Sequence, residues 1–301
     1  GTLINKVPHY VIEGFTFGIA VIIALQQLPM ALGIKKGSGD RTLITAFNTL
    51  KEALNNDFNA YALLVVAITL LFKFNFQRIL RLLKIKTYIP ASFGALLFGT
   101  TVAKLFDLKV STIGEIPRNV ARFTQPLFEN LTSLLWPALM IALLAAIESL
   151  LSARVADSLA HLPRERRLEP DQELIGQGLA TAVASIFGGQ PATGAIARTS
   201  VNVRAHAHTR LAAIFHSLVL LFIVLVAAPL FSQIPAAAIA GVLIGTSVRI
   251  LNPANLRELL RTTKGEITVY VATALATIAI DLIWGIALGL AVHFVVQKAS
   301  R

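Results

Sequence analysis

Residues 174–197 read LIGQGLATAVASIFGGQPATGAIA, a run of 24 residues without a charged side chain. About 20 helical residues span the hydrocarbon core of a bilayer, so this run is typical of a membrane segment. The middle of the run disfavours a continuous helix, because it contains Gly188, Gly189, Gln190 and Pro191. Irregular backbone at membrane depth is tolerated only where protein or a water-filled cavity surrounds it. The sequence therefore predicts two part-helices around a break, and the break is the first candidate for a functional site.

The rest of the chain has the same apolar character. Of 301 residues, only 14% are charged, whereas soluble domains carry about 25%, and the mean hydropathy is +0.70. This composition excludes an ordinary soluble enzyme. The chain has no cysteine, which excludes disulfides, Cys-based zinc sites and thiol catalysis. It also lacks the HExxH, GxSxG and Walker phosphate-loop patterns, so we expect a protein that is not an enzyme and has neither cofactor nor metal.

The lengths of the charge-free stretches predict an all-α integral membrane protein with ten membrane segments. We place them at residues 12–33, 58–73, 87–105, 132–154, 173–188, 193–204, 209–231, 235–251, 266–282 and 284–298. An even number puts both termini on one side, and most Lys and Arg residues of the connecting loops fall on that side. We therefore expect both termini in the cytoplasm and the protein in the plasma or inner membrane. The net charge of +11 then reflects topology rather than nucleic-acid binding.

Glu148 is the only charged residue between Leu134 and Ala153. A carboxylate at that depth costs about 2.5 kcal/mol or more, and such residues usually serve ion or proton pathways. Ser152 lies one helical turn later on the same face. Burial disfavours the charged form of a carboxyl group, which suits Glu148 to bind and release a proton. We predict that Glu148 and Ser152 couple an ion to transport; the alternative is that Glu148 pairs with a buried arginine or lies at the cytoplasmic interface.

A second helix is expected to start directly after the break. The residues expected in its first turn are small: Ala192, Thr193, Gly194 and Ala195. A helix that starts inside the membrane presents unpaired N–H groups and the positive end of its dipole, which can hold an anion. Arg198 would add positive potential one turn further on. Alternatively, Arg198 extends to the cytoplasmic surface alongside Arg204 and Arg210.

Two other patterns have simpler interpretations. Three pairs of glycines spaced by four residues predict close helix packing: Gly14 and Gly18, Gly241 and Gly245, and Gly285 and Gly289. Three histidines resemble a metal-binding cluster, but no carboxylate accompanies them at ligand spacing. We interpret these histidines as solvated or interfacial: His206, His208 and His216.

Several long stretches resemble the SulP anion transporters, the bacterial relatives of the SLC26 proteins. They are PHYVIEGFTFGIAVIIALQQL at 8–28, AAIESLLSARVAD at 145–157, DQELIGQGLA at 171–180 and FGGQPATGAIARTSVNVRA at 187–205. The resemblance implies a fold of fourteen segments, built as two inverted repeats of seven, in which a core domain moves against a gate domain. The ten segments would be the fifth to the fourteenth, with the broken helix near 188–198.

This resemblance also divides the chain. Residues 1–110 would be gate-domain helices of the first repeat, residues 111–231 core-domain helices with the anion site, and residues 232–301 gate-domain helices of the second repeat. The first four segments, one of which carries the half-helix that faces the broken one, would be missing. The cytoplasmic STAS domain would be missing too, so we expect a piece of a longer protein.

By the same resemblance, Glu148 matches an acidic residue of the eighth helix. That residue is Glu in members thought to couple to protons and Asp in a sodium-coupled bicarbonate branch, and Ser152 matches a hydroxyl downstream of it. Ala197 departs from the pattern, since some relatives have Ser there. We expect secondary active transport of a small anion (sulfate, bicarbonate or a dicarboxylate), as a symport with protons, by a homodimer in a lipid bilayer. The alternatives are an uncoupled anion channel and a truncated, non-transporting remnant.

Overall fold

The computed structural model describes residues 7–55, 58–84, 89–117, 123, 131–160, 167–207, 209–251, 259 and 262–299. In these ranges the regular structure is helical, and the only β pairing is an isolated bridge between Thr112 and Pro235. Among the residues that the structure describes, four helical segments are long and apolar enough to cross a membrane: His9–Leu32, Ala60–Leu82, Leu131–Ala160 and Leu211–Phe231. The shorter apolar helices are Ala91–Leu105, Ala236–Ile250 and Trp284–Lys298. The predicted all-α membrane class is confirmed.

The chain divides into two compact units. The central unit comprises residues 117–227 together with residues 1–7. The flanking unit comprises residues 8–116 and 228–301, so it joins parts of the chain that are far apart in sequence.

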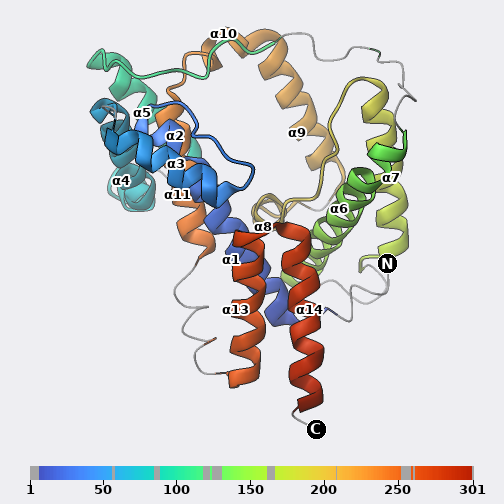
Figure 1. The fold of residues 1–301 in the computed structure, drawn as a ribbon. Coiled ribbons are helices and arrows are strands. Elements are labelled where there is room, and N and C mark those ends of the chain that lie inside the picture. The colour runs from blue at the N-terminus through green and yellow to red at the C-terminus, as the bar shows by residue number, and fades with distance from the viewer. Residues whose placement is uncertain are drawn as a thin grey trace. The chain divides into compact units, whose positions relative to one another are not determined.

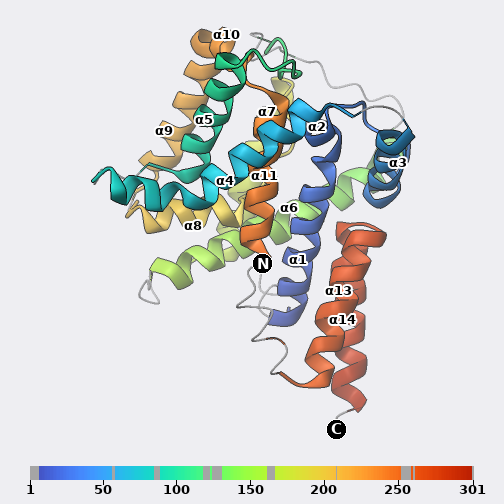
Figure 2. The same ribbon diagram turned by 90° about the vertical axis from the view of Figure 1, so that its left-hand side faces the viewer.

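The helices of the flanking unit come from both ends of the chain (Figure 1). They are α1 (His9–Gln26), α2 (Leu28–Leu32), α3 (Thr42–Asn55), α4 (Ala60–Leu82), α5 (Ala91–Leu105), α10 (Ala228–Phe231), α11 (Ala236–Ile250), α13 (Lys264–Ala279) and α14 (Leu282–Ala299). Helices α1, α13 and α14 lie side by side (Figure 1 and Figure 2), and α4 packs against both α5 and α11.

Two threonines of α13 lie between glycines of α1 and α14. Thr273 and Thr277 are fully buried, and each hydroxyl donates 2.7 Å to a carbonyl of its own helix. Gly18 of α1 and Gly285 of α14 both face Thr277, so closely that an added Cβ would overlap it. Gly289 faces Thr273 in the same way. Close packing at these glycines, and at Gly241 and Gly245 against α4, is therefore confirmed.

Several segment boundaries were wrong. The segment predicted at 58–73 is α4, which continues to Leu82, so Lys73 lies inside a helix rather than at its end. The segment at 12–33 corresponds to one apolar span, His9–Leu32, in which α1 ends at Gln26 and α2 begins at Leu28. The predicted loop 34–57 contains α3. The predicted segments 266–282 and 284–298 are confirmed as two short helices that meet at Asp281, since α13 ends at Ala279 and α14 begins at Leu282. The Asp281 carboxylate accepts a hydrogen bond from the Trp284 N–H at 2.8 Å.

The central unit contains the helices on either side of the predicted break. They are α6 (Leu131–Ala160), α7 (Pro170–Ile186), α8 (Ile196–Arg204) and α9 (Leu211–Phe222), and a π-helical turn follows at Ile223–Ala227. Helix α6 packs against both α7 and α8. It thus contacts the helices before and after the break.

Candidate functional site

The predicted break is present, at residues 187–195 between α7 and α8. Helix α7 ends because Gly188 adopts a left-handed conformation with φ of 74°, which favours glycine. The next residue, Gly189, donates its N–H to the Ala184 carbonyl at 2.8 Å. This bond pairs one of the last carbonyls of α7.

The second helix begins later than the sequence predicted. Ala192, Thr193 and Gly194 precede the helix, and Ala195 is its extended N-cap, with φ of −84° and ψ of 118°. Two side chains from elsewhere hold this stretch: Ser149 Oγ accepts from Gly194 N at 3.2 Å, and Gln177 Nε2 donates to the Ala192 carbonyl. These side-chain bonds replace helical bonds, so placing the first turn at 192–195 was wrong.

The first turn of α8 is Ile196–Thr199. Its first backbone bond runs from Thr199 N to Ala195 O at 3.0 Å, so the N–H groups of Ile196 and Arg198 precede the hydrogen-bonded ladder. The positive end of the α8 dipole therefore lies beside the break. The side chain of Arg198 is exposed.

Polar side chains of α6 bond to the break and to α8. Thr193 Oγ1 donates to Glu148 Oε2 at 2.6 Å, and the hydroxyls of Ser152 and Thr199 lie 2.6 Å apart. Ser149 and Ser152 are each 2% exposed, whereas Glu148 is half-buried. We call the residues Glu148, Ser149, Ser152, Thr193, Gly194 and Thr199 the α6–α8 cluster.

The α6–α8 cluster contains two polar residues that the sequence analysis missed. Ser149 follows Glu148 directly, and Thr199 follows Arg198. Their hydroxyls have no distinctive spacing of their own, and only the packing of α6 on α8 brings Thr199 against Ser152 and Ser149 against Gly194. The cluster gathers five side-chain oxygen groups and the N-terminus of a helix, which suits it to hold a proton or a cation close to an anion.

The flanking unit holds a buried cation that the sequence analysis also missed. Lys73 is 2% exposed, and its Nζ donates to the Val242 carbonyl and to Thr246 Oγ1, both at 2.6 Å. Both acceptors belong to α11. Burying an ionisable side chain within a membrane segment costs free energy, so such residues usually have a functional or structural role. Here the two hydrogen bonds of Lys73 connect α4 to α11.

Removing an acceptor of Lys73 is expected to destabilise the protein more than removing the lysine. Thr246→Val leaves a buried ammonium with one acceptor fewer, which costs about 1–3 kcal/mol. Lys73→Met removes the buried ammonium group itself. Its two former acceptors still bond to each other, because Thr246 Oγ1 donates to Val242 O at 2.8 Å. In detergent, the midpoint temperature of unfolding should be lower for Thr246→Val than for Lys73→Met.

Thr268→Val is the matched control for Thr246→Val. Thr268 is an exposed threonine of α13 that bonds its own helix at Lys264 O, at 2.8 Å. We expect its unfolding midpoint to stay close to that of the parent. A lower unfolding midpoint for Lys73→Met than for Thr246→Val would contradict the view that the buried charge of Lys73 makes its acceptors necessary.

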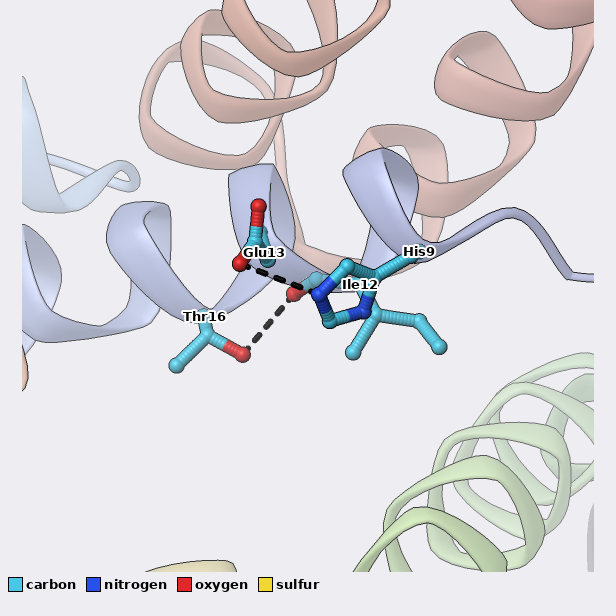
Figure 3. Close-up of polar contacts among 4 residues, drawn as sticks. All are labelled: His9, Ile12, Glu13 and Thr16. Atoms are coloured by element: carbon cyan, nitrogen blue, oxygen red, sulfur yellow. Dashed lines mark hydrogen bonds and ion pairs between the residues drawn. The ribbon is translucent and has the colours of Figure 1, made fainter. Parts of the chain in front are cut away.

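An exposed ion pair opens α1 (Figure 3). His9 Nε2 lies 3.2 Å from Glu13 Oε1, one helical turn along, and the Thr16 hydroxyl donates to the Ile12 carbonyl at 2.8 Å. The His9 side chain is 75% exposed, and an exposed pair contributes at most about 1 kcal/mol. The pair exists only when His9 is protonated, and it is not a candidate binding site.

The three histidines that resemble a metal-binding cluster in the sequence do not form a site in the described ranges. His208 lies outside the described residues, and His206 is an exposed residue with φ of 60°. No group of three potential metal ligands occurs among the residues that the structure describes.

Comparison with known proteins gives a consistent result. The profile of the sulfate permease family matches residues 1–273. YvdB of Bacillus subtilis (strain 168) is 35% identical over 98% of this chain and 55% of its own length. The bicarbonate transporter BicA of Synechocystis sp. (strain ATCC 27184 / PCC 6803 / Kazusa) is 30% identical over 96% of this chain and 50% of its own length. The chain thus spans about half the length of these relatives.

Solved structures show the same fold. The transmembrane domain of a cyanobacterial bicarbonate transporter BicA superimposes with a TM-score of 0.79 at 28% identity, over 95% of this chain and 71% of that one. The structure of SLC26A9 gives a TM-score of 0.80 at 18% identity, over 98% of this chain and 47% of that one. At that identity the second likeness concerns the fold alone.

Proposed function

Because the chain belongs to the sulfate permease family, a family of membrane anion transporters rather than enzymes, we propose that it takes part in proton-coupled secondary transport of a small anion. The names of two relatives support the substrate class, since one transports bicarbonate and another, from Arabidopsis thaliana chloroplasts, sulfate. A dicarboxylate belongs to the same chemical class. The anion is held at the N-terminus of α8, with Arg198 supplying positive potential.

The observation that carries this proposal is the hydrogen bond between Thr193 and Glu148. It joins the carboxylate of α6 to the segment that leads into α8, at 2.6 Å. An ionised Glu148 repels an anion near that helix end, by about 4 kcal/mol for charges 4 Å apart at an effective dielectric constant near 20. A proton on Glu148 removes the repulsion. Proton and anion therefore bind better together than separately, and the coupling is reciprocal.

The two units support a division into core and gate. The central unit, residues 117–227, corresponds to the proposed core of residues 111–231, and the flanking unit combines the two proposed gate segments. In this scheme the α6–α8 cluster belongs entirely to the core.

Both termini lie in the cytoplasm, and the assembly is a homodimer.

Uptake into liposomes tests the proposal. The purified protein is reconstituted, and entry of labelled sulfate, bicarbonate or succinate is followed with an acidic exterior and the membrane potential clamped at zero. Saturable uptake that increases with the pH difference supports proton-coupled transport. A steady ionic current without saturation would indicate a channel, and no uptake by residues 1–301 would favour the non-transporting remnant.

Arg198→Gln should weaken apparent anion affinity without abolishing uptake. Loss of a nearby positive charge costs about 1 kcal/mol, which corresponds to about a fivefold rise in KM. Arg210→Gln is the matched control, because Arg210 is also an exposed arginine of the central unit but caps α9 instead. An equal rise in KM for both variants would contradict a specific role for Arg198.

A further inference from the structure

A cavity lies in the flanking unit between the α1–α2 junction and α3. Its volume is about 360 Å³. Much of its lining is polar and includes Gln27, Lys36, Asp40, Arg41 and Thr42. None of the residues of the α6–α8 cluster belongs to this unit. The volume accommodates a small oxyanion together with several waters of about 30 Å³ each.

The wall that carries the charged residues is fixed to α3. Gly37 N donates to Thr49 Oγ1 at 3.0 Å, and Thr45 Oγ1 donates to the Gly39 carbonyl at 3.0 Å. Asn48 Nδ2 donates to the Ser38 carbonyl at 2.7 Å. Three consecutive loop residues are thus bonded to successive turns of one helix. The cavity is preformed, as ligand sites usually are.

The charges around the cavity favour an anion. Lys36 and Arg41 outnumber Asp40, and α3 begins at Thr42, so the N–H groups and positive dipole end of a 14-residue helix add to them. Arg41 Nη1 donates to the Ala279 carbonyl at 3.5 Å, which orients the guanidinium. Its other N–H groups remain available to oxygen atoms of a ligand.

Two other lining residues carry hydrogen-bond acceptors. Gln27 is 6% exposed, and its Nε2 donates to the Ile23 carbonyl at 3.1 Å. Its Oε1 is buried and has no partner among the residues that the structure describes. A buried acceptor without a donor costs about 1–3 kcal/mol. The Asp40 carboxylate is likewise only an acceptor.

We propose that this cavity binds a small oxyanion that retains an O–H group, such as hydrogencarbonate or hydrogenphosphate, at a site separate from the α6–α8 cluster. The anionic oxygens accept from Lys36, Arg41 and the first turn of α3. The O–H group donates to the Asp40 carboxylate. Sulfate at neutral pH has no proton to donate, so Asp40 disfavours it.

Cysteine protection tests the site, because the chain has no cysteine of its own. Thr42→Cys places one thiol in the wall, and its rate of modification by a neutral maleimide is measured in detergent at constant ionic strength. Hydrogencarbonate or hydrogenphosphate at about four times Kd should slow modification about fivefold. Sulfate should leave the rate unchanged. Absence of protection by both protonated anions, or equal protection by sulfate, would overturn the proposal.

Paired variants in the Thr42→Cys background locate the ligand. Lys36→Gln should remove protection, whereas Lys51→Gln, at an exposed lysine of α3 outside the lining, should keep it. Asp40→Asn should gain protection by sulfate, since the amide can donate. Arg198→Gln should retain protection, which separates this site from the proposed transport site. Protection that depends on Arg198 and not on Lys36 would assign the effect to the central unit and refute the second site.

Discussion

Glu148→Gln is expected to abolish the accumulation of anion that a pH gradient drives. A gradient of one pH unit supplies about 1.4 kcal/mol per proton, which supports up to a tenfold anion gradient when one proton accompanies each anion. Glutamine has nearly the same shape, and its Oε1 can still accept from Thr193, so the break should keep its structure. It cannot bind the proton. Labelled sulfate in liposomes should therefore reach equal concentrations inside and outside.

Glu169→Gln is the matched control for Glu148→Gln. Glu169 is an exposed carboxylate of the same unit, at the N-cap of α7, and its side chain does not cap the helix. This variant should accumulate sulfate as the parent does. Accumulation that persists in Glu148→Gln would rule out proton coupling through this residue. If a sodium gradient drives uptake in the parent instead, the oxygens of the α6–α8 cluster bind the metal ion and not a proton.

Gly285→Ala and Gly178→Ala are expected to change stability in opposite directions. A Cβ on Gly285 would lie 2.9 Å from Thr277 Cα, a backbone atom that cannot rotate away. Separating α13 from α14 should cost about 1–3 kcal/mol. A Cβ on Gly178 meets nothing within 4 Å, and alanine raises helix propensity by up to about 1 kcal/mol. The pair should therefore differ by about 1–4 kcal/mol.

Thermal unfolding of the two alanine variants in one detergent measures this difference. The midpoint of Gly285→Ala should fall and that of Gly178→Ala should rise slightly or stay constant. Similar midpoints would show that α13 and α14 can separate at little cost. That result would contradict the close packing of Thr277 between the glycines of α1 and α14.

Features that depend on neighbouring residues were predictable from the sequence. Glycine and proline break a helix wherever they cluster, so the interruption after α7 could be placed without knowledge of the fold. The same holds for the junction at Asp281, where each apolar half is too short to span the bilayer comfortably. The glycine pairs likewise predicted close packing, although not the threonines that they face.

Features that depend on distant residues were not predictable in the same way. The start of α8 is set by Ser149 and Gln177, which bond the preceding backbone from α6 and α7. Lys73 was assigned to a segment end because a charge normally marks one, but its acceptors lie in α11. The polar surface of the 34–57 loop concealed α3, whose buried face consists of small residues and threonines.

The tie between Lys73 and α11 also constrains how the protein is made. Lys73 and Val242 are separated by 169 residues. At synthesis rates of about 5–20 residues per second, α4 exists for roughly 8–34 s before α11 emerges. During that interval its ammonium group has neither of its native acceptors. Until the late helices arrive, this ammonium group therefore depends on water for its hydrogen bonds.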